Sequence, residues 1–300
     1  MTKMANFELI KPSVERIDEK DNLKRIELAG RVCYKSEDKI TEESAKAFCD
    51  KIRKRGHTSV MEHSNIIARM PWDEAVPIID AMAVYGDITG GHSHIMSEPY
   101  RRDWYFSGNM RAWLDLFDAV EDYNEQTTGV PLPISCMEDI AQYVIQEDQL
   151  PEPLRKRHTR ITLRVTCDRG VSHEFVRHRV MSFSQESTRY VNYGRRGFVF
   201  VAPWWWDSGD NRRHEILLGS MDYSVKAYEA LIADGASPQL ARAVLPNMIK
   251  TEVVVTATPE QWEAFLRLRL SKAAHPDMQR VARLVLEALG DDAEVQDENV

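Results

Sequence analysis

Residues 177–190 contain, within fourteen positions, three guanidinium groups, one imidazole and four hydroxyl side chains besides a phenol. The segment reads Arg177-His178-Arg179-Val180-Met181-Ser182-Phe183-Ser184-Gln185-Glu186-Ser187-Thr188-Arg189-Tyr190. A guanidinium offers a fixed fork of donors that matches phosphate and planar, oxygen-rich rings. We therefore expect this segment to bind a ligand.

Arg177 and Arg179 are two positions apart, so on a helix they would point roughly 200° away from each other. They could not then grip one group, which suggests two ligands or two subunits. Composition alone leaves two alternatives open, a solvated surface turn and a basic patch for nucleic acid.

The charge of the chain favours a small anionic substrate. The formal net charge is −8 and the isoelectric point is near 5.7, which argues against a general nucleic-acid binder because such a protein would repel a polyanion. The basic residues concentrate between 155 and 196 instead. A single-stranded nucleic-acid-binding module, using this stretch with Tyr190, Tyr193 and Phe198 as stacking rings, is the alternative function.

Other motifs predict neither a metal site nor a membrane segment. His57 and His63 are six residues apart with no third ligand nearby, and His92-Ser93-His94 follows two glycines that favour a loop. The four cysteines form no C-x-x-C pair, so reduced thiols are expected. Without an apolar signal core or a membrane-length apolar run, we expect a cytoplasmic protein.

Apolar periodicity predicts a mixture of helices and strands that would position these residues. Strands are expected at 7–12, 65–70, 160–167, 198–203 and 251–256. Helices are expected at 20–33, 41–55, 73–85, 109–125, 135–148 and 214–234, with further helices opening at Ser237-Pro238 and covering 262–269. Ser172 is expected to cap a helix that includes Glu174, Arg177, His178 and Arg179, so that the fourteen-residue segment begins on a helix and ends in a loop.

The spacing Arg-His-Arg-x-x-Ser-x-x-x-x-Ser-x-Arg-Tyr resembles the signature of the flavin-dependent thymidylate synthases, the ThyX family. Ser184 departs from it, since the family usually has Asn there. Gly56-His57-Thr58-Ser59, Pro238 to Pro246 and Trp262 to Pro276 resemble three weaker family motifs. The resemblance implies an α+β, ThyX-like mixed fold with a central antiparallel sheet flanked by helices. It also implies a single catalytic domain over 1–300, with a mainly helical insertion at about 71–157.

The resemblance further implies reductive methylation of dUMP to dTMP. FAD would be the cofactor, methylenetetrahydrofolate the carbon donor and NADPH the reductant, in a homotetramer with active sites between subunits. No nucleic acid, membrane or metal would take part. Cys167, at a strand end near the segment, has no adjacent His or helix N-terminus to lower its pKa. Ser187 lacks a placed acid to orient His178 as its base, so covalent catalysis by either group is disfavoured.

The family motifs, matched residue by residue, imply the site. Cofactor-binding residues would be His57, Ser59, Arg177, His178, Arg179 and Gln185. Substrate-binding residues would be Glu174, Arg177, Gln185, Glu186, Ser187, Thr188, Arg189, Arg242 and Arg269. Arg269 would be catalytic, stabilising the anion that develops at the N3 edge of the pyrimidine, with Arg267 as the alternative in that helix. Family flavin contacts that would fall at Thr258, Glu260 and Ala264 are not carried over, because these residue types differ.

Overall fold

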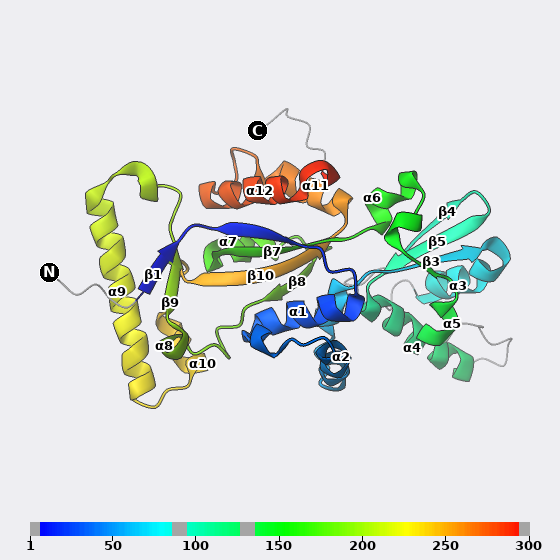
Figure 1. The fold of residues 1–300 in the computed structure, drawn as a ribbon, viewed down its shortest axis with the longest axis horizontal. Coiled ribbons are helices and arrows are strands. Elements are labelled where there is room, and N and C mark those ends of the chain that lie inside the picture. The colour runs from blue at the N-terminus through cyan, green and yellow to red at the C-terminus, as the bar shows by residue number, and fades with distance from the viewer. Residues whose placement is uncertain (1–6, 86–94, 127–135, 294–300) are drawn as a thin grey trace.

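The computed structural model describes residues 7–85, 95–126 and 136–293. Three parts follow one another along its long axis (Figure 1). One end is built around a long helix, the middle is a sheet with helices on both faces, and the other end is a second sheet with its own helices. The fold is therefore mixed helix and sheet, as predicted.

The central sheet has four antiparallel strands in the order β2-β7-β10-β8. They are β2 (Ser13–Ile17), β7 (Ile161–Asp168), β8 (Ser182–Gln185) and β10 (Lys250–Ala257). Successive side chains of a strand point to opposite faces, so Val253 and Val255 join the core under one face and Val254 the core under the other. All three are fully buried because helices cover both faces.

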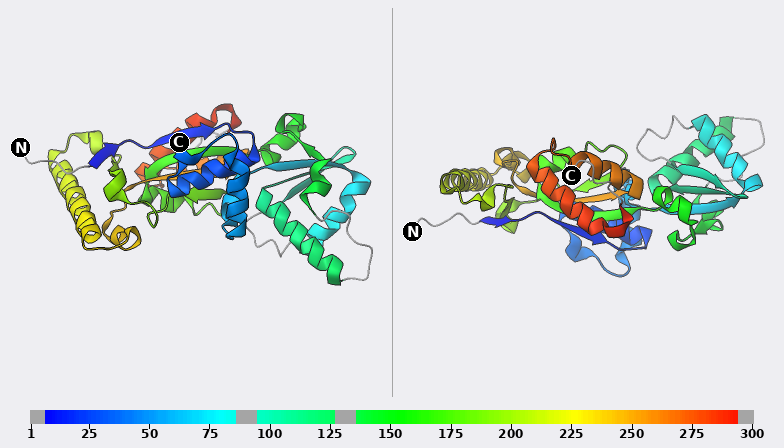
Figure 2. Two further views of the ribbon diagram at one scale, coloured as in Figure 1. Left: turned by 60° about the horizontal axis from the view of Figure 1, so that its bottom comes forward. Right: turned by 90° about the horizontal axis from the view of Figure 1, so that it is seen from above.

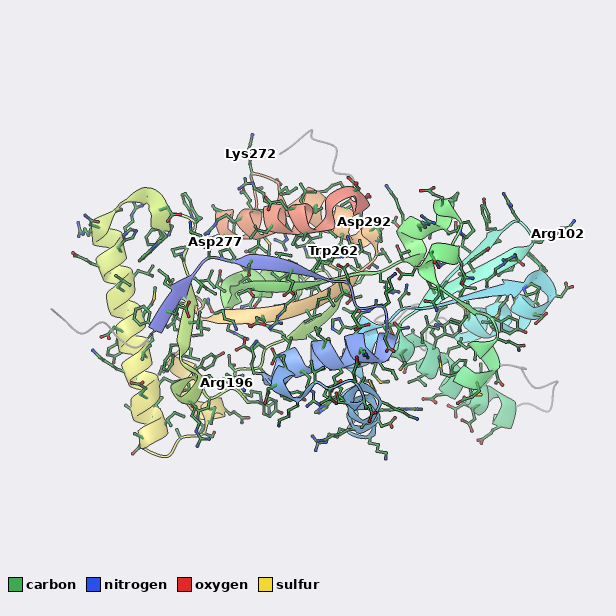
Figure 3. The ribbon with its side chains drawn as sticks, viewed as in Figure 1. Arg102, Arg196, Trp262, Lys272, Asp277 and Asp292 are labelled. Atoms are coloured by element: carbon green, nitrogen blue, oxygen red, sulfur yellow. The ribbon has the colours of Figure 1, made fainter. Side chains whose placement is uncertain are left out.

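Two pairs of helices cover the central sheet (Figure 1; Figure 2). On one face lie α11 (Pro259–Arg269) and α12 (Pro276–Leu289), and on the other α1 (Asn22–Tyr34) and α2 (Ser44–Lys54). Thr258 caps α11 by accepting from the Gln261 amide, and Gln261 accepts from the Thr258 amide in return. Trp262, labelled in Figure 3, is fully buried and donates from Nε1 to the Ile161 carbonyl at 3.2 Å, which fixes α11 against β7.

A parallel pair of strands and a long helix form one end. The elements are β1 (Phe7–Ile10), α8 (Tyr193–Arg196), β9 (Phe198–Val201), α9 (Asn211–Ala233) and α10 (Pro238–Ala241). The strand predicted at 7–12 is confirmed as β1, which ends before Pro12, a residue without an N–H to continue the ladder. Strand β2, which follows Pro12, was not predicted. β1 pairs with β9, and the chain then enters the central sheet as β2.

The segment predicted as a helical insertion supplies strands β4 (Met96–Tyr100), β5 (Asp103–Gly108) and β6 (Val144–Ile145) of a second sheet, and β3 (Ile66–Pro71), just before it, supplies the remaining strand. The strands of this sheet have the order β4-β5-β3-β6. The helices of the segment are α3 (Trp72–Tyr85), α4 (Met110–Gln126), α5 (Met137–Ala141) and α6 (Arg155–His158). The helix predicted at 135–148 is wrong beyond Ala141. Strands β4 and β5 were not predicted.

The helix that opens the fourteen-residue segment is shorter than predicted. It is α7 (Arg169–Phe175), capped by Asp168, whose carboxylate accepts from the Val171 amide at 2.9 Å. The Ser172 hydroxyl instead donates to the Arg169 carbonyl inside the helix. The helix starts four residues earlier than predicted and ends at Phe175, so Arg177, His178 and Arg179 lie in the turn after it. The angle of roughly 200° expected between Arg177 and Arg179 on a helix therefore does not apply.

Short 3-10 turns connect several elements. They are η1 (Glu37–Lys39), η2 (Thr58–His63), η3 (Glu147–Gln149), η4 (Glu152–Leu154), η5 (Trp206–Ser208), η6 (Arg242–Val244) and η7 (Gly290–Asp292). The helix predicted at 41–55 begins three residues later, at Ser44, whose hydroxyl is hydrogen-bonded to the Thr41 backbone. Among the described helices, none is long and apolar enough to cross a membrane.

Candidate active site

Arg269, the last residue of α11, lies against two other predicted site residues. Its Nη1 donates to Glu174 Oε2 at 2.7 Å, its Nη2 to the Glu174 carbonyl at 3.0 Å and its Nε to His178 Nε2 at 3.1 Å. The Arg269 side chain is only 13% exposed. The fold thus brings together α7, the turn after it and the end of α11, which are far apart in the chain.

The imidazole of His178 in this cluster is neutral. Burial, followed by the positive charge of Arg269, lowers the pKa of His178 to about 4. At neutral pH its Nε2 therefore accepts the hydrogen bond from Arg269, and its other ring nitrogen holds the proton. The edge of the ring packs against Phe265, with centroids 5.0 Å apart. His178 orients a guanidinium here and adds no charge.

The alternative arginine of the same helix lies elsewhere. Arg267 is exposed two positions before Arg269, so it faces another direction and makes no hydrogen bond or ion pair with the described part of the chain. Of the two arginines left open by the sequence, Arg269 is the one that contacts Glu174 and His178.

Arg177 and Arg179 lie exposed in the turn between α7 and β8. Neither guanidinium has an ion pair or side-chain hydrogen bond within residues 7–85, 95–126 and 136–293. On either side of this pair, Val176 and Val180 are 41% and 62% exposed. The turn therefore presents two unpaired positive charges and two apolar side chains outward.

Glu186 belongs to a buried ionic network that the sequence analysis missed. Its carboxylate is 3% exposed and accepts from Lys250 at 2.9 Å, with Lys35 at 3.8 Å. Both lysines also contact Glu252, each at 2.5 Å. Arg164 pairs with Glu252 and, at 3.2 Å, with Glu37. We call Lys35, Glu37, Arg164, Glu186, Lys250 and Glu252 the Glu252 network.

A signal for this network was present in the sequence. Lys250 and Glu252 are charged residues two apart in a strand of β-branched residues, so they share one face of β10. Lys35 could not have been found from the sequence, because its placement depends on the left-handed backbone at the end of α1, with φ 49°.

A pocket of about 320 Å³ adjoins the network. Its lining residues come from η1, α8, β9, β10 and the loops beside them, and are Lys35, Glu37, Glu186, Val191, Tyr193, Arg196, Gly197, Val199 and Lys250. Arg196, labelled in Figure 3, donates to the Lys35 carbonyl at 2.5 Å and joins α8 to the end of α1. Charged side chains of both signs therefore line this pocket, and most of them already have partners.

The rest of the predicted substrate set lies in residues 186–189, which we call the signature loop. The Ser187 amide donates to the Cys33 carbonyl at 3.0 Å. Thr188 is buried and its hydroxyl accepts from Arg242 at 3.3 Å. Arg189 is exposed and donates to Gln239 Oε1 at 3.1 Å. The structure thus joins Arg242 to the signature loop.

The three other predicted cofactor residues, Gln185, His57 and Ser59, come from strand β8 and from the start of η2. Gln185 is part of β8 and donates to the hydroxyls of Ser172 and Thr251. His57 is exposed and shares a hydrogen bond of 3.1 Å with the Tyr34 hydroxyl, whose ring packs 5.3 Å from that of Tyr190. Ser59 is exposed on η2. Neither His57 nor Ser59 contacts the Arg269 cluster within this chain.

Metal and thiol chemistry find little support in the described residues. No group of three or more His, Cys, Asp or Glu side chains within them could hold a metal ion, while His92 and His94 lie outside them. His63 is fully buried against the Thr256 hydroxyl, and burial lowers its pKa to about 3. Cys167 is also fully buried, and burial strongly raises the pKa of its thiol.

A protein-family model described as "Thymidylate synthase complementing protein" matches residues 16–72 and 137–293, more than half of the chain. The chain belongs to this family. The matched spans contain the Arg269 cluster, the signature loop and the Glu252 network. Residues 73–136 of the predicted insertion fall outside the match.

Parts of this chain are similar to proteins named flavin-dependent thymidylate synthase. The one from Geobacter sulfurreducens is 36% identical over 114 residues, covering 38% of this chain and 49% of the relative. The one from Mycobacterium avium is 36% identical over 152 residues, covering 45% and 59%. The one from Pyrococcus furiosus is 30% identical over 154 residues, covering 48% and 62%. The chain therefore spans about half to three fifths of the relatives' length.

Among solved structures, a UMP/dUMP methylase, PolB from Streptomyces cacaoi with bound 5-Br dUMP, aligns with 94% of this chain and 90% of its own. The sequence identity is 16% and the TM-score 0.41. This likeness is too weak to establish a common fold.

Proposed function

We propose that this protein is a flavin-dependent thymidylate synthase that methylates dUMP to dTMP, with methylenetetrahydrofolate as carbon donor and NADPH as reductant. The observation that supports it best is the contact of Arg269 with Glu174 and His178, beside two exposed arginines, inside the span matched by the family. The relatives' shared name, flavin-dependent thymidylate synthase, supports the same reaction.

Arg269 is the group we assign to the chemical step. An arginine has five N–H donors, and three of those of Arg269 are directed at Glu174 and His178. The remaining donors are held in a fixed plane and would stabilise negative charge as it develops at the N3 edge of uracil. Glu174 and His178 fix the guanidinium, so little reorganisation is needed during the reaction.

We assign the signature loop and Arg242 to dUMP binding. The exposed Arg189 guanidinium provides donors for phosphate, with Ser187 and Thr188 as hydroxyl partners. Arg242 contacts Thr188 and would hold both the loop and the nucleotide. We also assign Gln185 to dUMP binding. Glu186 is saturated by protein cations, so we assign it to support of the loop.

The donor set of the turn fits the diphosphate of FAD. Arg177 and Arg179 are exposed and unpaired within the described residues, and His178 retains one N–H. His57 and Ser59 would contribute a second set of polar contacts. Bound reduced flavin would supply the hydride for the transferred carbon. The protein's own residues bind, orient and polarise the base.

Covalent activation of the base by a protein nucleophile is disfavoured. The Ser187 hydroxyl accepts from the Arg189 amide at 3.3 Å, while His178, the only candidate base in the segment, is bonded to Arg269. Cys167 and Cys49 are buried with raised pKa values, about 12 for Cys49. A thiolate attack on the pyrimidine would need the opposite shift.

A homotetramer with active sites between subunits is part of the proposal. The exposed Val176 and Val180 lie next to the unpaired Arg177 and Arg179, a combination suited to burial against another subunit and its ligand. His57 and Ser59, which do not reach the Arg269 cluster within one chain, would complete the site of a neighbouring copy. We also propose a cytoplasmic location.

The alternative nucleic-acid-binding function has less support. Tyr193 and Phe198 are buried in the core beside α9, so neither ring is available for base stacking. Lys156, Arg157 and Arg164 are paired with acidic residues. The basic stretch of 155–196 is therefore divided among several ion pairs.

One experiment decides the proposed function. The purified protein, supplied with FAD, NADPH, methylenetetrahydrofolate and dUMP, should form dTMP, and after desalting it should keep an absorbance band at about 450 nm. A colourless, folded protein that forms no dTMP would refute the proposal. Oligonucleotide affinity that falls steeply with salt would then favour the alternative.

A further inference from the structure

We propose that Glu252 is a positioning residue that holds the signature loop in its binding-competent place by fixing Lys35 and Lys250 against Glu186. Glu252 lies on β10 and is mostly buried. The consequence for dUMP binding rests on the proposed function, whereas the effect on the loop does not.

The contacts form a continuous chain from the central sheet to the loop. Glu252 holds the ammonium groups of Lys35 and Lys250 at 2.5 Å each, and Lys250 donates to Glu186 at 2.9 Å. The Glu186 amide also donates to the Glu252 carbonyl at 2.8 Å. The loop is thus tied to one strand by both its backbone and its first side chain.

The charges of the Glu252 network balance. It contains three cations, Lys35, Arg164 and Lys250, and three anions, Glu37, Glu186 and Glu252. Buried charges are tolerated when each is paired and hydrogen-bonded, and removing one partner leaves an uncompensated charge. Without the Glu252 carboxylate, three cations would share only two anions, Glu37 and Glu186. The contact between Lys250 and Glu186, which orients the Glu186 side chain, would then compete with other ion pairs.

The loop that this network supports is the one assigned to dUMP. Ser187, Thr188 and Arg189 directly follow Glu186, and only one further backbone bond, from Ser187 to Cys33, ties this part of the loop to α1. Among the described residues, no hydrogen bond or ion pair joins the network to Glu174, His178 or Arg269. A change in Glu252 should therefore alter substrate binding and leave the chemical step largely intact.

The test compares Glu252→Gln with Glu27→Gln in the FAD-loaded protein. Glu27 is also buried and paired, with Arg31 at 2.9 Å, but lies away from the signature loop. We expect Glu252→Gln to raise the KM for dUMP about tenfold with kcat changed less than about twofold. Amide hydrogen exchange in residues 186–191 should become about tenfold faster. Glu27→Gln should change neither quantity.

Two further variants keep the result interpretable. Glu252→Asp retains the charge and should restore most of the affinity for dUMP. Lys35→Gln removes one cation of the network. It should also raise the KM for dUMP and the rate of exchange in 186–191, by smaller factors than Glu252→Gln, and it tests the proposal even if Glu252→Gln does not fold. Unchanged exchange in 186–191 in folded Glu252→Gln and Lys35→Gln would overturn the proposal. Faster exchange in a protein that makes no dTMP would support the positioning role and refute only the proposed function.

Discussion

Two ionic clusters lie at opposite ends of the same segment, and they differ in how many of their charges are already paired. At the start, Arg269 is held by Glu174 and His178 beside the unpaired Arg177 and Arg179. At the end, the Glu252 network has as many anions as cations, each with a partner. Unpaired donors can bind a ligand, whereas a saturated network can only hold what is attached to it. Similar residue types therefore have different roles.

The largest expected effect concerns Arg269. Arg269→Lys keeps the charge but loses the planar fork that contacts Glu174 and His178. The single-turnover rate of flavin oxidation should fall by roughly 100-fold or more, with dUMP affinity changed much less. Stopped-flow absorbance of the reduced, methylenetetrahydrofolate-loaded protein measures this rate.

Arg267→Lys is the matched control, since Arg267 is exposed in the same helix and contacts neither Glu174 nor His178. It should react at the wild-type rate. A slow Arg267 variant beside a normal Arg269 variant would transfer the catalytic role to Arg267, and normal rates in both would remove α11 from the chemistry.

The next effect concerns substrate affinity. Arg189→Ala removes exposed donors that we assign to dUMP, and should weaken its binding by about 2 kcal/mol without unfolding the protein. The lost hydrogen bond to Gln239 is at the surface and should cost little stability. Calorimetric titration with dUMP measures the change. Unchanged affinity in the folded variant would exclude Arg189 from the site.

A smaller effect is expected for the pH dependence of stability, to which Glu252 contributes. Burial alone would raise the pKa of Glu252, but Lys250 and Lys35 outweigh it and lower the pKa to about 2. The unfolded carboxyl titrates near 4.5, so this group stabilises the fold above that pH and loses its contribution as pH falls toward 2. At pH 3.5 the wild type should have lost about 1 kcal/mol of this contribution. The free energy of unfolding, measured with urea, should depend less steeply on pH between 5 and 3.5 in Glu252→Gln than in the wild type. An equal dependence on pH would mean that the charge of Glu252 is not stabilised in the folded protein.

The smallest effect is expected for the thiols. A variant with Cys33→Ser, Cys49→Ala, Cys136→Ser and Cys167→Ala should still form dTMP, with some loss of stability from the two buried positions. A well-folded variant that binds FAD and dUMP but forms no product would contradict flavin chemistry without a thiolate.

In the central part of the molecule, the sequence predicted β7, β10, α1, α2 and α11, because their hydrophobic periodicity is strong. It did not predict β2, β8 or α12. The family motifs named Glu174, His178 and Arg269 as site residues with separate roles. Their mutual contacts were not predicted, because they join residues 91 and 95 positions apart. Strands β4 and β5 of the second sheet were missed because their aromatic residues, with Arg101 and Arg102 in the turn between them, are equally typical of a binding surface.

Apart from the alternation of Lys250 and Glu252 on β10, the Glu252 network was beyond sequence reasoning for a physical reason. Its members come from the end of α1, β7, β10 and the signature loop, and their pairing depends on strand register and on one left-handed residue. Arg164 and Glu252, for example, approach each other because β7 and β10 are antiparallel neighbours. Long-range register of this kind is not encoded in local spacing.

The most direct test of the contrast between the clusters is single-turnover flavin oxidation at saturating dUMP, measured on Glu252→Gln and Arg269→Lys in parallel. We predict that Glu252→Gln reacts within about twofold of the wild type once dUMP is saturating, while Arg269→Lys is slower by roughly 100-fold. A slow Glu252→Gln beside a normal Arg269→Lys would contradict the assignment of chemistry to one cluster and loop support to the other.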